Sequence, residues 1–157
     1  MGNAPKSLVT LISASQAREG LTFIHRGESP GCRDCEYYKV CIGNLEAGRI
    51  YRITKVRDRV LRCKLHDLDM NVVEVVEAEV TAAIPSKMAV EGATIEFKTP
   101  DCGRDDCDNY NICFPVGLVA GDRCKVLRVM EVLKCPLGLS LRRASVLRRP
   151  PPSRTPR

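Results

Sequence analysis

Eight of the nine cysteines in this chain form two groups of four with closely similar spacing. They are Cys32, Cys35, Cys41 and Cys63 in the first group and Cys102, Cys107, Cys113 and Cys135 in the second. In each group three thiols lie close together and the fourth follows after a long β-rich segment. One loop and one strand end could therefore supply four sulfurs to a single metal or iron–sulfur centre.

The spacing leaves the identity of the centres open. Zinc sites typically use pairs of closely spaced cysteines, and only Cys32 and Cys35 are separated by two residues in that way. Iron–sulfur clusters often take three cysteines from one loop and a fourth from elsewhere. We therefore expect two [4Fe-4S] clusters, with two zinc ions as the alternative and disulfides as the structural alternative to both.

The residues around the two groups also repeat. Glu19-Gly20 recurs as Glu91-Gly92, and Gly48, which precedes the first long β-rich segment, recurs as Gly121. A tyrosine stands between the second and third cysteine of each group, at Tyr38 and Tyr110, and we expect both rings to pack over the centres. The pattern indicates an internal duplication with two units packed about a pseudo-twofold axis. We expect an N-terminal lead at 1–8, repeat units at 9–79 and 80–149, and a basic tail at 150–157.

The elements that must position these cysteines are mainly strands. Aromatic residues are few and there is no Trp, so Val, Ile and Leu must build the core, which favours β-structure. We predict a mainly β fold with short helices (α+β), made of two small β-rich units that are each stapled by a four-cysteine centre. One helix is expected over Ser13–Arg18, before Gly20. The predicted strands are Val9–Ile12, Leu21–Arg26, Ile50–Cys63, Asn71–Val80, Ala93–Lys98, Cys124–Cys135 and Leu139–Leu147.

Positive charge is concentrated in two places, and the formal net charge of the chain is +6. One is the first long strand, and the other is the C-terminal segment, which has no acidic residue after Glu131. A solvated strand face would explain the first concentration alone, but together the two favour a phosphate-binding surface. The predicted RNA contacts are Arg49, Arg52, Arg57, Arg59, Arg62, Arg142, Arg143, Arg148, Arg149, Arg154 and Arg157.

No catalytic motif accompanies the cysteines, so we expect no enzyme and no small-molecule substrate. Our first hypothesis is a non-enzymatic RNA-binding protein that contacts ribosomal RNA on a ribosomal subunit. The alternative is a two-cluster iron–sulfur electron carrier or redox sensor. The early apolar run Leu8–Ile12 is too short for a signal core or a membrane span, so a cytoplasmic location without membrane contact is expected.

Three further residues invite a functional interpretation and are better explained structurally. Cys124 stands outside both groups, on a predicted strand, and is expected to be a small buried hydrophobe. His25 and His66 do not recur in the other repeat. His66 follows Cys63 closely enough to be a ligand, but we expect an exposed loop residue.

The duplicated cysteine blocks, with Glu-Gly-x-Thr before them and Leu-x-x-Gly after them, resemble the archaeal uncharacterised protein family 0179. The resemblance covers about Val9 to Arg149 and implies an archaeal, cytosolic source. It also implies iron–sulfur centres at the eight cysteines named above, with no activity or substrate attached.

Overall fold

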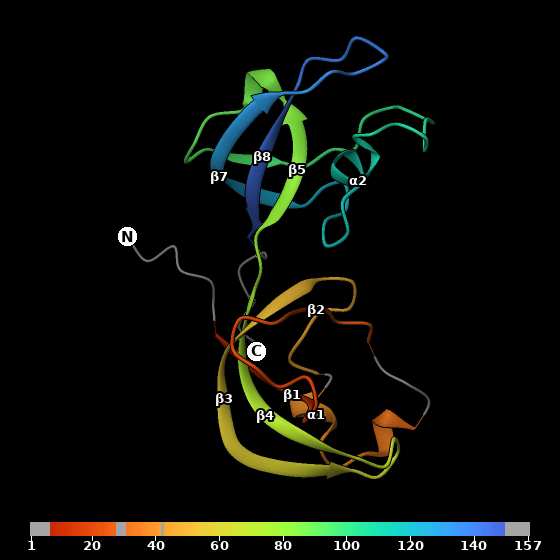
Figure 1. Ribbon diagram of the computed structural model, residues 1–157, viewed down its shortest axis with the longest axis vertical. Helices are drawn as coiled ribbons and strands as arrows, with labels where there is room; N and C mark the ends of the chain where they lie inside the picture. Colours follow the sequence, from red (N-terminus) through yellow and green to blue (C-terminus); the bar gives the residue numbers. More distant parts are fainter. Residues whose placement is uncertain (1–6, 28–30, 42, 150–157) are drawn as a thin grey trace, which may run out of the picture. The chain divides into compact units, whose positions relative to one another are not determined.

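The structure is a computed structural model that describes residues 7–27, 31–41 and 43–149. The chain divides into two compact units, Met1–Ala78 and Glu79–Arg157, and each contains one four-stranded antiparallel sheet (Figure 1). The prediction of a mainly β protein with a few short helices is confirmed. No helix within the described ranges is long and apolar enough to cross a membrane.

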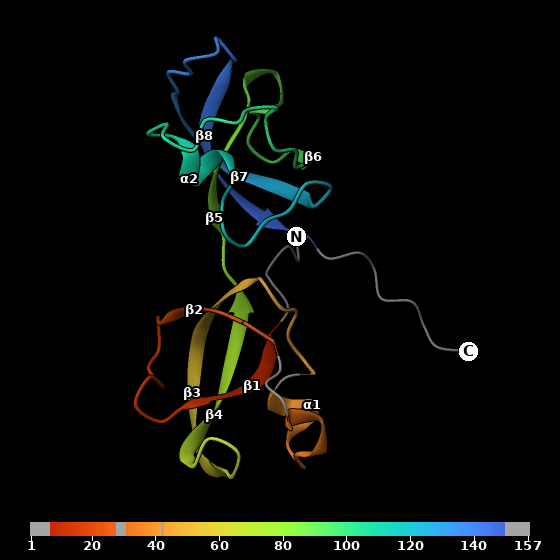
Figure 2. The same cartoon turned by 90° about the vertical axis from the view of Figure 1, so that its right-hand side faces the viewer.

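The first unit contains a sheet in the order β1-β4-β3-β2. Its strands are β1 (Leu8–Ser13), β2 (Thr22–Ile24), β3 (Ile50–Cys63) and β4 (Leu68–Glu77). Two single-turn helices, η1 (Cys32–Asp34) and α1 (Tyr38–Cys41), lie in the connection between β2 and β3. The long β3–β4 hairpin bends strongly (Figure 1), and α1 lies beside β1 (Figure 2).

The second unit repeats this arrangement with a sheet in the order β5-β8-β7-β6. Its strands are β5 (Val80–Pro85), β6 (Thr94–Glu96), β7 (Arg123–Val132) and β8 (Leu141–Arg148). The helices are η2 (Ser86–Met88), after β5, and α2 (Tyr110–Cys113), which packs against β5 as α1 packs against β1. The duplicated sequence therefore folds into the same sheet order twice.

The predicted glycine turns before the long strands take up matching conformations. Gly48 and Gly121 have φ angles of 88° and 98°, a region in which other residues are strained. The Gly48 amide donates to the His25 carbonyl at 2.7 Å, and the Gly121 amide donates to the Phe97 carbonyl at 2.8 Å. These turns fix where β3 and β7 begin. Because each strand has a set length, they also determine where its far end lies relative to the cysteine loop.

The core of each unit is built by that unit's own strands. In the first unit Ile53, Val73 and Val75 are at most 1% exposed, and they pack with Leu45 and Tyr51. In the second unit the core includes Ala83, Cys113, Leu133 and Leu141, so one of the predicted ligands is itself part of the hydrophobic cluster. Burial of aliphatic and small side chains explains how strands with few aromatic residues can pack.

The helix predicted over Ser13–Arg18 is wrong. Strand β1 continues through Ser13, and a turn follows in which the Gln16 amide donates to the Ser13 carbonyl at 2.9 Å. The Ala14 amide also donates to the Asp69 carbonyl at 2.9 Å. Pairing with β4 therefore overrides the local helix propensity of this segment.

Both long hairpins contain two register shifts along their central strand. In β3 they lie between Ile53 and Lys55 and between Val56 and Val60. In β7 they lie between Val126 and Arg128 and between Val129 and Val132. Extra residues in one strand change which side chains face the core beyond that point. The side-chain orientation in the distal halves of β3 and β7 therefore cannot be extrapolated from their first halves.

Candidate metal centre

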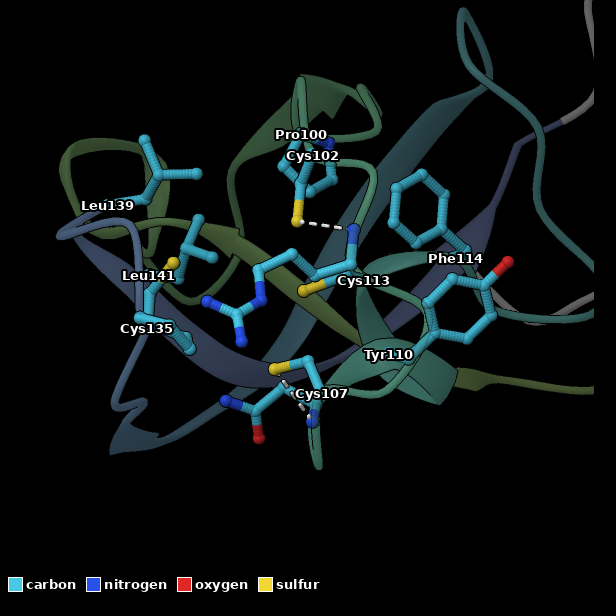
Figure 3. Close-up of a pocket in the computed structure, with 12 residues that line it drawn as sticks. Pro100, Cys102, Cys107, Tyr110, Cys113, Phe114, Cys135, Leu139 and Leu141 are labelled. Carbon is cyan, nitrogen blue, oxygen red and sulfur yellow. Dashed lines mark hydrogen bonds between the residues drawn. The ribbon is translucent and has the colours of Figure 1, made fainter.

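The second unit brings its four cysteines to one pocket. Cys113 is the last residue of α2, Cys102 and Cys107 lie in the loop before that helix, and Cys135 follows β7. All four line the same pocket together with apolar side chains that include Leu139 and Leu141. Figure 3 shows their sulfur atoms directed towards the interior of this pocket. Residues far apart in sequence thus come together as the spacing predicts.

Asn109 joins the three-cysteine loop to the fourth cysteine. Its side-chain amide donates to the Lys134 carbonyl at 2.9 Å, and Lys134 directly precedes Cys135. Its backbone amide donates to the Cys107 sulfur at 3.4 Å. One residue therefore contacts both parts of the site, and the loop cannot move away from the strand end without breaking these bonds.

Backbone amides point at sulfur in both units. The Arg104 amide donates to the Cys102 sulfur, and the His66 amide donates to the Cys63 sulfur, each at 3.4 Å. Such N–H···S bonds stabilise negative charge on sulfur and are a usual feature around thiolate-ligated metals and clusters. Both units therefore direct a backbone amide donor at one of their grouped sulfurs.

The first unit gathers its cysteines through β1 and α1. The Thr10 hydroxyl donates to the carbonyl of Cys41, the last residue of α1, at 2.9 Å. Cys63 is the last residue of β3. Burial, followed by the neighbouring thiols of Cys32, Cys63 and Cys35, raises the pKa of Cys41 to about 11. All four thiols are therefore close enough to influence one another electrostatically.

Cys113 has the corresponding environment in the second unit. Burial raises its pKa, and the nearby thiols of Cys107, Cys135 and Cys102 raise it further. None of the nine cysteines forms a disulfide. Four thiols that converge in this way can share a cation at their centre, so the donor set fits a soft metal ion or an iron–sulfur cluster.

The grouped thiols do not lie at metal-ligand distances from one another. Within the described ranges, no three Cys, His, Asp or Glu side chains are grouped closely enough to hold an ion as they stand. Seven of the eight cysteines are half-buried and Cys113 is buried. The four thiols of each unit would have to move inwards together to bind a shared ion or cluster.

Two residues of the second site escaped the sequence reasoning. Arg104 lines the cysteine pocket with its side chain half exposed, and its Nε lies 3.7 Å from an oxygen of Asp106. A cation here offsets negative charge on sulfur. Asn109, described above, is the other. An arginine between the first two cysteines of both groups, at Arg33 and Arg104, was a signal available in the sequence.

The predicted RNA contacts of the first unit are not equally available. Arg49 is only 7% exposed, and its Nε donates to Glu46 at 2.7 Å. Arg57 is exposed and pairs with Glu74 at 3.0 Å, and the exposed Arg62 pairs with Asp67 and Asp69. Arg52 is half-buried and Arg59 is exposed. Arg49 therefore belongs to the turn before β3 and is left out of the proposed surface.

The second unit places its arginines in several environments. Arg148 is only 8% exposed, while Arg149 is exposed. Arg142 donates from Nε and Nη2 to the Met130 carbonyl at 2.9 and 2.7 Å. Arg143 pairs with Glu131 at 2.8 Å. Arg142 and Arg148 have internal positions, and Arg154 and Arg157 lie outside the described residues.

The remaining singled-out residues have structural surroundings. Cys124 is completely buried in β7, and the exposed His66 contacts Cys63 through its backbone amide. His25 is 8% exposed, its ring lies edge-on to Tyr51, and burial lowers its pKa. Tyr110 lines the cysteine pocket and stacks at a tilt on Phe114, with 5.0 Å between the ring centroids.

Comparison with known proteins identifies a family and several relatives that this chain resembles. The pattern of the Uncharacterised protein family (UPF0179) matches residues 8–146. A UPF0179 protein of Methanosarcina barkeri is 41% identical over 141 residues, which cover 88% of this chain and 94% of the relative. A UPF0179 protein of Methanothermobacter thermautotrophicus is also 41% identical, over 146 residues that cover 91% of this chain and 97% of the relative.

A more distant relative in Pyrococcus furiosus is 38% identical over 128 residues, with 82% of this chain and 88% of the relative covered. These three relatives are archaeal proteins, as the family resemblance implied. No solved structure matches the fold. Both the family pattern and the identities extend across the two cysteine groups, and the chain is therefore a member of the uncharacterised protein family UPF0179.

Proposed function

We propose that this chain is a non-enzymatic RNA-binding protein whose two units each hold a four-cysteine metal or iron–sulfur centre, and that its target is ribosomal RNA. The observation that carries the first part is the gathering of Cys102, Cys107, Cys113 and Cys135 at one pocket. The repeated sheet order supports a second, equivalent centre at Cys32, Cys35, Cys41 and Cys63. Each centre would tie a loop to a strand end and stabilise a unit too small to rely on its core alone.

A [4Fe-4S] cluster in each unit is our preferred centre. Three ligands from one loop and a fourth from a strand end match cluster ligation, and amide donors to sulfur are common around clusters. Zinc would use the same thiolates as a purely structural ion. Either centre, with four thiolates, carries a net charge of about −2, so the cation of Arg104 favours both.

The RNA surface is proposed on the exposed side chains of the β3 region. Lys55, Arg59 and Lys64 are exposed, and none of them has an ion pair with another described residue. Arg57, paired with Glu74, lies between them in sequence. Cations that are not neutralised by a neighbour can pair with phosphates, and the arginines of the C-terminal tail would add to the same attraction.

A charge-matched pair of variants tests this surface. Changing Lys55, Arg59 and Lys64 to Gln should weaken binding to ribosomal RNA and lower the salt dependence of log K by about two to three, one for each phosphate that is no longer neutralised. The control removes three charges from the equivalent strand of the other unit, as Arg123→Gln, Lys125→Gln and Arg128→Gln. Equal weakening in both variants would show a general charge effect and refute the assigned surface.

Sedimentation tests the target itself. In an anaerobic lysate of the source organism at low salt, the protein should migrate with a ribosomal subunit and carry its metal, and high salt should release it. Deleting 150–157 should weaken this association. Protein that stays at the top of the gradient at low salt, with its metal bound, would rule out the ribosomal target while leaving the centres intact.

Electron transfer is the second candidate, because the ligands are accessible. Seven of the eight grouped cysteines are half-buried, so a cluster held by them would lie near the surface. A carrier or redox sensor requires reversible reduction of the centres. Anaerobic potentiometry followed by electron paramagnetic resonance would detect it, and a centre that contains zinc or accepts no electron would eliminate it.

A further inference from the structure

A second cavity opens in the second unit beside the cysteine pocket. It has a volume of about 480 Å³ and lies where the end of β5, the segment after β6 and the β7–β8 loop meet. That volume is in the range of sites for small organic ligands. None of the eight grouped cysteines lines this cavity, so it is distinct from the site described above.

The cavity combines an apolar lining with a cationic rim. Pro85, Pro100, Leu139 and Leu141 are among the apolar residues that line it. Two exposed lysines, Lys87 in η2 and Lys98 after β6, also line it, and neither has an ion pair with another described residue.

Three hydroxyl groups accompany the two lysines. Ser86, Thr99 and Ser140 line the cavity, and the Ser140 hydroxyl donates to the Ser86 hydroxyl at 2.9 Å. The only acid among the lining residues is Asp101, so the rim has a net formal charge of +1. Lysines and hydroxyls together are the usual protein partners of a phosphate group.

We infer that this cavity binds a nucleotide, with its phosphate at Lys87 and Lys98 and its base against the proline and leucine side chains. A nucleotide has one anionic group and one flat face of low polarity, which matches the two parts of the lining. The inference rests on the proposed function in one respect, since the nucleotide would belong to the bound RNA. A free mononucleotide has the same phosphate and base, and the test below distinguishes it from RNA by measuring the binding of each.

The first unit has different residues at the corresponding positions. By the repeat offset, Ser15 replaces Lys87 and Gly27 replaces Thr99, while Arg26 retains the charge of Lys98. The carbonyl that accepts from the Ser86 amide belongs to Ser140, and the equivalent carbonyl in the first unit belongs to Asp69. The first unit thus lacks one of the two cations and has Asp69, which pairs with Arg62, in place of Ser140, so the phosphate site is assigned to the second unit alone.

The cavity shares a wall with the second centre. Pro100, Leu139 and Leu141 line both the nucleotide cavity and the cysteine pocket, and Figure 3 shows the two leucines beside Cys135. Pro100 is also only two residues before Cys102. Because these side chains pack against both sites, loss of the second centre should disturb the base-binding surface. The side chains that the two sites share all belong to the second unit.

The test uses the full-length protein with its native metal content. Binding of a labelled four-nucleotide RNA and of labelled adenosine monophosphate is measured for the native chain and for the Lys87→Gln, Lys98→Gln double variant. The double variant should bind the short RNA at least about tenfold more weakly, the effect expected from removing two phosphate-binding cations. The control, Arg123→Gln with Arg128→Gln, removes the same charge from β7 and should bind as the native chain does.

The outcomes separate this inference from the proposed function. Saturable binding of the mononucleotide that the double variant loses would support the cavity as a nucleotide site even if ribosomal RNA does not bind. Loss of short-RNA binding alone would support a site for a nucleotide within a chain. If the double variant binds both probes as tightly as the native chain, the inference is overturned, while binding through the β3 region would still stand on its own variants.

Discussion

Replacing Arg142 with alanine should destabilise the second unit by about 2 kcal/mol. Its guanidinium donates twice to the Met130 carbonyl, at 2.9 and 2.7 Å, in the part of β7 where the register with β8 shifts. A hydrogen bond from a charged donor contributes about 1.5–3 kcal/mol. Because both bonds share one acceptor on a half-buried side chain, we expect one such contribution and not two.

The neighbouring arginine supplies the matched control. Arg143 pairs with Glu131 at 2.8 Å, and its side chain is 35% exposed while that of Glu131 is 60% exposed. Ion pairs this accessible contribute about 0–1 kcal/mol. The Arg142→Asn variant tests the mechanism further, because Asn71 occupies the equivalent place in the first unit and its amide donates to the Arg57 carbonyl at 3.4 Å. Asparagine should restore part of the stability that alanine removes.

Hydrogen exchange of the metal-loaded protein measures the effect locally. A loss of about 2 kcal/mol should lower the protection of the β7 and β8 amides about thirtyfold in Arg142→Ala, and protection in the first unit should not change. Arg143→Ala should lower it by less than about fivefold. Equal losses of amide protection in Arg142→Ala and Arg143→Ala would refute the structural role assigned to Arg142. Weaker RNA binding by Arg142→Ala with unchanged amide protection would refute it as well.

Three other predictions follow from the cysteine pockets and the buried histidine. Cys113→Ser should halve the metal content per chain and lower the protection of the second unit, because the first centre has its own ligands; complete metal loss would contradict separate centres. Arg104→Gln should lower the reduction potential of an iron–sulfur centre, or speed metal loss from a zinc centre, and an unchanged second centre would refute its electrostatic role. Because burial lowers the pKa of His25, the unfolded state binds the proton more readily, so the first unit should lose stability as pH falls below about 6.5. His25→Phe, which introduces the residue present at Phe97, should remove that pH dependence in unfolding experiments at pH 5 and 7.

The sequence repeat predicted a mainly β fold and most of its strands because it constrains many residues at once. Matching glycines, strands and cysteines in the two halves had to serve the same roles, and the two sheets do have the same order. The predicted strand Ile50–Cys63 coincides with β3. The helix over Ser13–Arg18 failed because it depended on local composition alone, and pairing of β1 with β4 determines that segment.

The orientation of the arginines could not be obtained from the sequence. Register shifts in β3 and β7 change which residues face inwards, and they depend on strand pairing that leaves no clear local pattern. Arg142 was therefore grouped with Arg143 although it binds a backbone carbonyl. Arg49 and Arg148 were also counted as surface charge because arginine is usually exposed, and both are buried.

The same limit applies to the cysteine site. Spacing identified the eight cysteines, because ligands that recur at fixed intervals are visible in a sequence. It could not identify Asn109, which contacts Lys134 across the site, or Thr10, which holds the end of α1. Side chains that orient a loop have no required spacing relative to the ligands, so only the folded structure reveals them.

Metal and sulfide analysis of the anaerobically purified chain tests the central claim most directly. Two four-cysteine centres of the preferred type predict about eight iron and eight sulfide atoms per chain, with the absorption of [4Fe-4S] clusters that disappears on exposure to air. About two zinc atoms without sulfide would keep both centres and change their identity. A folded protein that binds neither metal would contradict the account.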